Sequence, residues 1–295
     1  DTALLQKAAR VLCSEEYRTA LRQQLAAGAR SFAAARQAAV QTLCPGSDIA
    51  ALLDKPNNNL AVEYCKAIIE QNVEMQPIAL PRQGADHGQA LTESAHAAFA
   101  SASALRALWA EGGAAALAPY VPEKALKLYI MAEYDGKYTD FAVMGHCELA
   151  LLRAACAGQA PFAAVRGVSE GLEHRLENAV RETASLPALL DALTTVRYPR
   201  ARMRRLAMDA ALGYTAQTPA LPPYLHLLGA RKEALPLPRE TALPLSHSLA
   251  RLARENEPCA QMAAAQSRAS DLGALCRAKP EPMGGIYRQK IIFLT

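Results

Sequence analysis

Residues 31–40 read Ser31-Phe32-Ala33-Ala34-Ala35-Arg36-Gln37-Ala38-Ala39-Val40, and this pattern is typical of the whole chain. Serine is a preferred residue at the N-cap of a helix, and alanine has the highest helix propensity. Alanine makes up about a fifth of the 295 residues, whereas aromatic residues make up 5%. Because large β-sandwiches and barrels are rich in aromatic residues, the composition predicts a mainly α protein.

Caps and apolar spacing outline the elements on either side of this stretch. Three short helices are expected within residues 3–43, and Pro56 begins another because proline is favoured in the first turn. The best strand candidate is residues 73–80, an apolar run next to prolines. The proline-rich residues 219–244 are expected to form loops. Clear helical patterns occupy residues 170–177, 186–195 and 201–212.

The two parts of the chain differ in pattern. Residues 1–115 are typical of an α/β domain with little strand visible, as if its strands lay elsewhere. Residues 116–295 have an almost wholly helical pattern. We therefore expect a mainly α fold with a partial α/β portion, divided between residues 115 and 116.

Charge, hydropathy and cysteine content exclude several classes of protein. The net charge is only +4, and 51% hydrophobic residues argue against intrinsic disorder. No run of 18 apolar residues is present, so neither a transmembrane helix nor a membrane partner is expected. The seven cysteines include no Cys-x-x-Cys pair and are typical of buried thiols in a reducing cytoplasm. The six histidines are too widely spaced for a metal motif, so no metal site is expected, and no P-loop or Gly-x-Gly-x-x-Gly sequence is present.

Three strings carry polar groups suited to a nucleotide. Lys55-Pro56-Asn57-Asn58-Asn59 places amides beside the unpaired N–H groups of a helix start, where phosphates or a base can bind, although plain N-capping is the simpler explanation. Arg82, after the candidate strand, could clamp a phosphate or could simply be solvated. Ser101 and Ser103 place hydroxyls ahead of the Arg106 cation, which suits an anion or a routine helix cap.

Five arginines fall within nine residues, next to a tyrosine. On a helix Arg200 and Arg204 share one face, while Met203, Leu206 and Ala207 supply an inward one. Arginines beside a tyrosine suit an RNA backbone and an unstacked base, whereas a charge run is otherwise a solvated face. No acidic residue interrupts the segment, which favours contact with RNA. The segment comprises Arg197, Tyr198, Arg200, Arg202, Arg204 and Arg205.

Six short strings of the sequence resemble strings that occur in the same order in the tRNA(Met) cytidine acetate ligase family. The resemblance runs from Asp1 to about Gly229. The first string, Lys55-Pro56-Asn57-Asn58, is similar to that family's Lys-Pro-Asn-Asn helix start. The other strings are Met75 to Arg82 with the loop 84–87, Ala102-Ser103-Ala104-Leu105-Arg106, Glu170-Gly171-Leu172-Glu173-His174-Arg175, Arg197-Tyr198 with Arg202 and Arg205, and Tyr224-Leu225-His226-Leu227-Leu228-Gly229.

The resemblance implies an incomplete nucleotidyltransferase (Rossmann-like) domain followed by an all-helical, tRNA-binding domain. Members of the family use ATP, with Mg²⁺ expected as its counter-ion, to activate acetate as acetyl-adenylate. They then form N4-acetylcytidine at the wobble position of elongator tRNA(Met), and no DNA partner is implied. By this resemblance the arginine segment contacts tRNA, and the ATP contacts are Asn57, Arg82, Gln83, Ser103 and Arg106.

The sequence departs from the family at two places. The family's nucleotide site begins with a strand, a His-x-Gly-His motif and a Gly-Ser-Glu segment, and none of these is present here. The catalytic residues are therefore unknown, and an N-terminally truncated chain of low activity is expected. Ala104 stands where the family has serine, which removes one hydroxyl.

Two other functions stay open: a non-catalytic RNA-binding protein, and a nucleotidyltransferase that acts on a small molecule.

Overall fold

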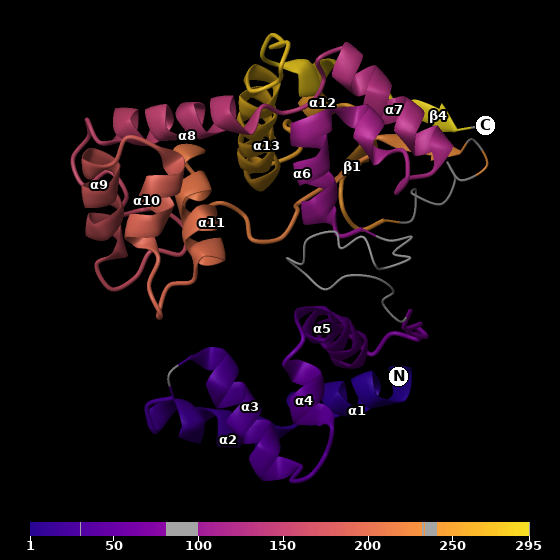
Figure 1. Ribbon diagram of the computed structural model, residues 1–295, viewed down its shortest axis with the longest axis vertical. Coiled ribbons are helices and arrows are strands. Elements are labelled where there is room, and N and C mark those ends of the chain that lie inside the picture. The colour runs from indigo at the N-terminus through magenta and orange to yellow at the C-terminus, as the bar shows by residue number, and fades with distance from the viewer. Residues whose placement is uncertain (30, 81–99, 232, 234–240, 295) are drawn as a thin grey trace. The chain divides into compact units, whose positions relative to one another are not determined.

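The computed structural model describes residues 1–29, 31–80, 100–231, 233 and 241–294 (Figure 1). The chain divides into two compact units, Asp1–Leu105 and Arg106–Thr295. Both are mainly helical, and every strand in the described residues belongs to the second unit. The predicted mainly α class is therefore confirmed. The assignment of a nucleotidyltransferase domain to residues 1–115 and a tRNA-binding domain to residues 116–295 stays a prediction.

Helices with short polar caps build the first unit. The side chains of Asp1, Ser14 and Ser31 each accept a hydrogen bond from a backbone N–H in the turn that follows. These caps confirm the three short helices predicted within residues 3–43. The helices are α1 (Thr2–Cys13), α2 (Glu15–Ala26), α3 (Phe32–Leu43), α4 (Ile49–Leu53) and α5 (Pro56–Glu70).

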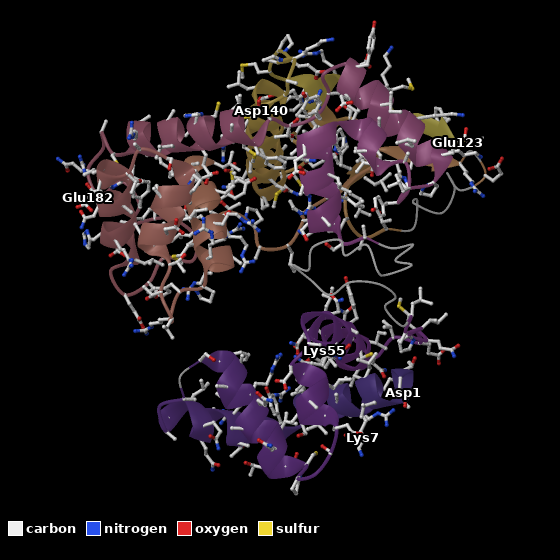
Figure 2. The ribbon with its side chains drawn as sticks, viewed as in Figure 1. Asp1, Lys7, Lys55, Glu123, Asp140 and Glu182 are labelled. Atoms are coloured by element: carbon white, nitrogen blue, oxygen red, sulfur yellow. The ribbon has the colours of Figure 1, made fainter. Side chains whose placement is uncertain are left out.

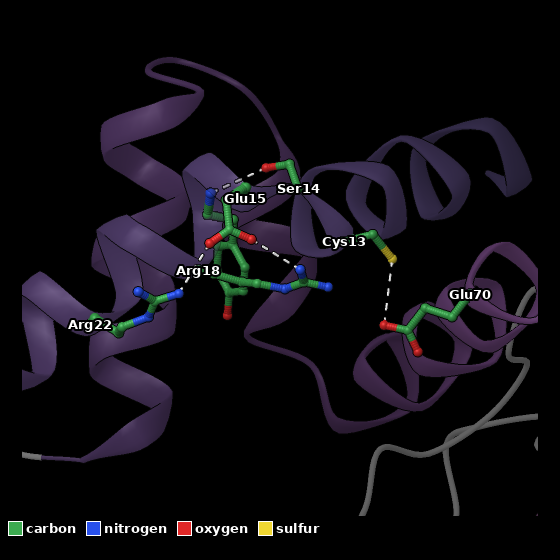
Figure 3. Close-up of polar contacts among 7 residues, drawn as sticks. Cys13, Ser14, Glu15, Arg18, Arg22 and Glu70 are labelled. Carbon is green, nitrogen blue, oxygen red and sulfur yellow. Dashed lines mark hydrogen bonds and ion pairs between the residues drawn. The ribbon is translucent and has the colours of Figure 1, made fainter.

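Exposed ion pairs follow the Ser14 cap along α2 (Figure 3). The Glu15 carboxylate lies 3.0 Å from the guanidinium of Arg18 and 3.1 Å from that of Arg22. All three side chains are well exposed, so water and salt screen these pairs and they add little stability. The packing of the apolar faces has to hold the helices together.

Small apolar side chains form the core of the first unit. Ala8, Ala9 and Ala39 are fully buried, together with Ile49 and Val62. Helix α1 packs against α5, and α2 packs against α3. Alanine therefore supports the fold twice, because it favours helix and also lets neighbouring helices approach closely.

The predicted strand over residues 73–80 is wrong. None of these residues lies in a strand, and the described part of the first unit holds no strand with which they could pair. The N–H of Met75 donates to the carbonyl of Val73 at 3.0 Å, and the N–H of Ala79 donates to the hydroxyl of Thr2 at 3.3 Å. An apolar run becomes a strand only when a partner satisfies its backbone groups, and here local and side-chain contacts take that place.

The second unit consists mostly of helices. The clear helical patterns of the sequence are confirmed at α9, α10 and α11, with shifts of a few residues at their ends. The 3-10 helices Ala114–Leu117 and Gly285–Arg288 connect larger elements. The α-helices are α6 (Ala102–Gly112, which begins before the division between the units), α7 (Glu123–Tyr134), α8 (Phe141–Ala155), α9 (Leu172–Glu182), α10 (Leu186–Leu193), α11 (Arg200–Ala211), α12 (Leu249–Leu252) and α13 (Glu257–Leu275).

Short parallel strands also occur in this unit, so the prediction that it is entirely helical is wrong in that detail. Strand β1 (Leu225–His226) pairs with β3 (Leu245–Ser246), and β2 (Gly229–Arg231) pairs with β4 (Ile292–Leu294). Two of these strands lie within the segment expected to form loops. Strands of two or three residues are too short to produce a periodic pattern in a sequence.

The largest core of the second unit joins α8, α9, α10 and α11 (Figure 1). Leu152, Leu176, Leu189 and Met203 are fully buried in it. The burial of Met203, Leu206 and Ala207 confirms the predicted inward face of α11 and turns its arginines outward. No helix in the described residues is long and apolar enough to cross a membrane.

Candidate nucleotide and nucleic-acid interfaces

The three consecutive asparagines at the start of α5 have different surroundings. The amide of Asn58 donates to the carbonyl of Leu52 at 3.1 Å, and that of Asn59 donates to the carbonyl of Leu53 at 2.8 Å. Both satisfy carbonyls at the end of α4, which have no partner within that helix. Plain N-capping is therefore not their role, and the N-cap of α5 is Lys55, which Figure 2 labels.

Asn57 lies in the first turn of the same helix and is exposed. Its side chain makes no hydrogen bond with any other residue that the structure describes, whereas Asn59 also accepts one from Arg36 at 2.8 Å. The amide of Asn57 is thus available to a ligand, while its two neighbours hold α4 against α5.

The start of α6 contains a cap and two outward-facing polar groups. Ser101 is buried, and its hydroxyl accepts from the N–H of Ala104 at 3.2 Å and lies 3.0 Å from the hydroxyl of Ser103. Ser103 and Arg106 are exposed and lie one turn apart on the helix. Ser101 is therefore a routine cap, whereas Ser103 and Arg106 are exposed, and their contact with ATP stays a prediction. The predicted ATP contacts Arg82 and Gln83 lie outside the described residues.

The arginine segment occupies the turn before α11 and its first two turns. All five arginines are exposed, and Tyr198 between them is half-buried. The guanidinium carbon of Arg202 lies 5.0 Å from the centre of the Tyr198 ring, and that of Arg197 lies 5.8 Å from it. Such cation–π contacts hold flexible guanidinium groups in place. The structure thus brings Arg197 and Arg202 together around the ring of Tyr198, and the other arginines of the segment are exposed along α11.

Carboxylates from other elements pair with two of these arginines, which the sequence pattern did not indicate. Glu170, before α9, pairs with Arg197, and Asp191 of α10 pairs with Arg200. The absence of acidic residues from the segment itself therefore does not mean that all its arginines lack partners. Within the described residues, no carboxylate lies at ion-pair distance from Arg202, Arg204 or Arg205.

A polar groove, which the sequence analysis missed, lies beside Tyr198. Its volume is about 470 Å³, and it runs along one face of α9 past the end of α10. Glu170 lines it and accepts a hydrogen bond from the Tyr198 hydroxyl at 3.4 Å. The other polar residues of the groove are Arg175, Asn178 and Glu182. Their spacing along one face of a helix was the only signal of the groove in the sequence.

The sequence analysis also missed one buried acid. Glu148 of α8 is 1% exposed, and its Oε1 has no hydrogen-bond partner among the described residues. Burial raises the pKa of its carboxyl to about 7, although the positive charge of Arg204 opposes the rise. Glu148 thus lies on α8, which packs against α11, the helix that carries Arg204. Within the described residues, no group of three or more histidine, cysteine, aspartate or glutamate side chains is placed to hold a metal ion.

Comparison with known proteins identifies the family. The family described as HIGH Nucleotidyl Transferase matches residues 1–283. The chain belongs to this family. The first unit and most of the second therefore lie within the HIGH nucleotidyltransferase match. The resemblance seen in the sequence is thereby confirmed.

Relatives with curated names agree with the family. A "tRNA(Met) cytidine acetate ligase" of Listeria monocytogenes serotype 4b (strain CLIP80459) is 31% identical over 183 residues, covering 61% of this chain and 45% of the relative. Another, from Thermoanaerobacter sp. (strain X514), is 27% identical over 247 residues, covering 81% of this chain and 59% of the relative. The chain spans about half the length of the curated relatives that it matches.

Solved structures share the fold. Thermotoga maritima TmcAL in its apo form I has a TM-score of 0.83 at 23% identity, covering all of this chain and 75% of that one. Its form II, bound with alpha-thio ATP, has a TM-score of 0.81 at 22% identity and covers 74% of that chain. At these identities the likeness shows the fold of this HIGH nucleotidyltransferase and leaves its substrates to be inferred.

Proposed function

We propose that the protein is a cytoplasmic, ATP-dependent ligase that activates acetate as acetyl-adenylate and forms N4-acetylcytidine at the wobble position of elongator tRNA(Met). The observation that carries this proposal is the set of three exposed arginines on α11, namely Arg202, Arg204 and Arg205. These arginines are exposed and have no carboxylate partner in the described residues. They belong to a chain whose curated relatives are named for a tRNA substrate.

The described residues at the two helix starts fit ATP. Asn57 offers an exposed amide that can donate and accept, and Ser103 and Arg106 offer a hydroxyl and a cation one turn apart. Amide, hydroxyl and guanidinium groups are ligands of a base and of phosphates, and Mg²⁺ would accompany the phosphates. We assign Arg82 and Gln83 to the same ligand on the family resemblance. When bound, ATP supplies the adenylyl group that activates the acid.

The arginine segment fits the backbone of RNA, and its members differ in availability. Arg197 and Arg200 already have carboxylate partners, so a phosphate would have to compete with Glu170 and Asp191. Arg202 and Arg205 have no such competitor among the described residues and offer the strongest contacts. We therefore rank Arg202 and Arg205 above Arg197 and Arg200 as tRNA contacts, with Tyr198 holding Arg202 in place.

The salt dependence of tRNA binding tests this assignment. Binding of a fluorescent elongator tRNA(Met) transcript is measured by anisotropy between low and physiological salt. In the double variant Arg202→Ala/Arg205→Ala, we expect the slope of log K against log salt to fall by roughly 0.7–0.9 for each phosphate contact that is lost. An unchanged slope would remove α11 from the RNA surface.

A charge-matched control separates a specific contact from the overall charge. Arg251→Ala/Arg254→Ala removes the same charge from exposed positions in and just after α12. This control is expected to change the slope much less than the α11 variant. Equal effects would mean that tRNA responds only to the net charge of the protein.

A further inference from the structure

The groove along α9 combines small side chains with polar ones, which suits a flat polar ligand. Ala179 and Ala192 lie on its walls, and their small side chains leave the space of about 470 Å³ open. Arg175, Asn178 and Glu182 follow one another at helical spacings of three and four residues, so they line the same face of α9. Ligand sites are commonly of this size, with apolar walls and a few polar groups.

Tyr198 joins the groove to Arg202. The Tyr198 side chain lines the groove, while its ring lies 5.0 Å from the guanidinium carbon of Arg202. Its backbone is fixed as well, because its N–H donates to the Thr195 hydroxyl at 2.9 Å and its carbonyl accepts from the Thr195 N–H at 3.0 Å. A group held by Arg202 thus has a fixed polar groove beside it.

The polar groups of the groove are partly available to a ligand. One nitrogen of the Arg175 guanidinium donates to the carbonyl of Ala192 at 2.6 Å, which fixes the side chain and leaves further N–H groups. Asn178 and Glu182 are exposed and make no side-chain hydrogen bond with another described residue. Figure 2 labels Glu182 at the end of α9.

We propose that this groove binds one unpaired nucleotide of RNA, with its phosphate on Arg202 and its base against Asn178 and Glu182. This inference rests on the proposed binding of tRNA. A protein ligand is less well suited, because the groove opens beside Arg202, which has no carboxylate partner in the described residues. Bases in unpaired RNA are read by hydrogen bonds along their edges, and Arg175 and Asn178 supply donors and an acceptor for that purpose.

The carboxylate of Glu182 adds a preference among bases. An ionised carboxylate can only accept hydrogen bonds, so it favours an exocyclic amino group, which offers two N–H donors, over the single ring N–H of uracil. Cytosine, adenine and guanine carry such a group, and uracil does not. The groove is therefore expected to prefer a nucleotide with an amino-bearing base.

Uncharged substitutions test the groove without disturbing long-range electrostatics. Asn178→Ala removes a polar edge, and Ala192→Leu fills the space, and both positions are exposed, so the fold should tolerate them. In the double variant we expect tRNA binding about tenfold weaker, with an unchanged salt slope. His174→Ala, on the same helix but outside the groove, serves as the control and should bind like the wild type.

The outcomes distinguish the groove from the proposed function. If the double variant binds tRNA with wild-type affinity, the proposal that the groove binds a nucleotide is wrong, and the proposal that the protein binds tRNA still stands. No binding of tRNA by the wild-type protein would overturn both. Competition by short single-stranded oligocytidine over oligouridine supports the preference for an amino-bearing base, and equal competition would overturn that preference.

Discussion

At the scale of single residues, Glu148 is the feature with the clearest consequence for stability. Its pKa rises from 4.5 to about 7 because burial disfavours the charged carboxylate. Between these two values the folded state binds more protons than the unfolded state. The free energy of unfolding therefore falls as pH rises through this window, and the loss is complete above pH 7.

Glu148→Gln should remove this pH dependence. Glutamine has nearly the same shape and stays neutral, so the variant is expected to exceed the wild type in stability by about 3 kcal/mol at pH 8. The difference should shrink towards zero near pH 4.5, where the wild-type carboxyl is protonated. Urea unfolding of both proteins at several pH values measures it. A constant difference between pH 5 and pH 8 would mean that Glu148 does not titrate in this range.

The residue scale also shows a limit of sequence analysis. No acidic residue lies within the arginine segment, so its sequence alone did not indicate that Arg197 and Arg200 are paired. Glu170 and Asp191 reach them only after α9 has packed against α10 and α10 against α11. The basic character of the segment could be predicted from the sequence, whereas which of its arginines are already paired could not.

At the scale of elements, the start of α5 combines a structural contact with a candidate binding group. Asn59→Ala removes hydrogen bonds to Leu53 and Arg36 and should lower the free energy of unfolding by about 1–3 kcal/mol. Asn57 is exposed, and Asn57→Ala removes no side-chain hydrogen bond with the described residues, so it should leave stability within about 0.5 kcal/mol of the wild type. Urea unfolding compares the two variants.

Asn57→Ala should act on the nucleotide instead. If the amide is buried against ATP, its removal weakens binding by about 1–3 kcal/mol, which calorimetric titration with ATP detects. Asn57→Asp is a useful companion, because it keeps the size and places a negative charge where phosphates are expected. ATP affinity equal to that of the wild type in both variants would remove Asn57 from the nucleotide site.

Elements differed in how well they could be predicted. Helices α1 to α3 could be predicted from their caps and apolar spacing. These signals lie within a few residues of each other, so the local sequence is sufficient to predict these helices. Residues 73–80 have the composition of a strand but no partner strand in the described part of the first unit, and pairing is a property of the fold rather than of the segment. The groove along α9 likewise depends on the neighbouring α10 and Tyr198.

At the scale of the whole molecule, family and fold are established, and the activity is the central claim. The match to the HIGH nucleotidyltransferase family covers residues 1–283. The six strings that carried the resemblance lie in both units, so a nucleotide site and an RNA surface are expected in one protein. With a net charge of only +4, the proposed affinity for tRNA is expected to come from the local arginine segment rather than from overall charge.

The most direct test is acetylation of tRNA by the protein purified from its natural source. The protein is incubated with ATP, isotopically labelled acetate and elongator tRNA(Met), and the nucleosides are analysed by mass spectrometry after digestion. We predict labelled N4-acetylcytidine that requires ATP and disappears when the wobble cytidine is replaced by uridine. Binding of the tRNA without any labelled cytidine would contradict the ligase account and support a non-catalytic RNA-binding protein.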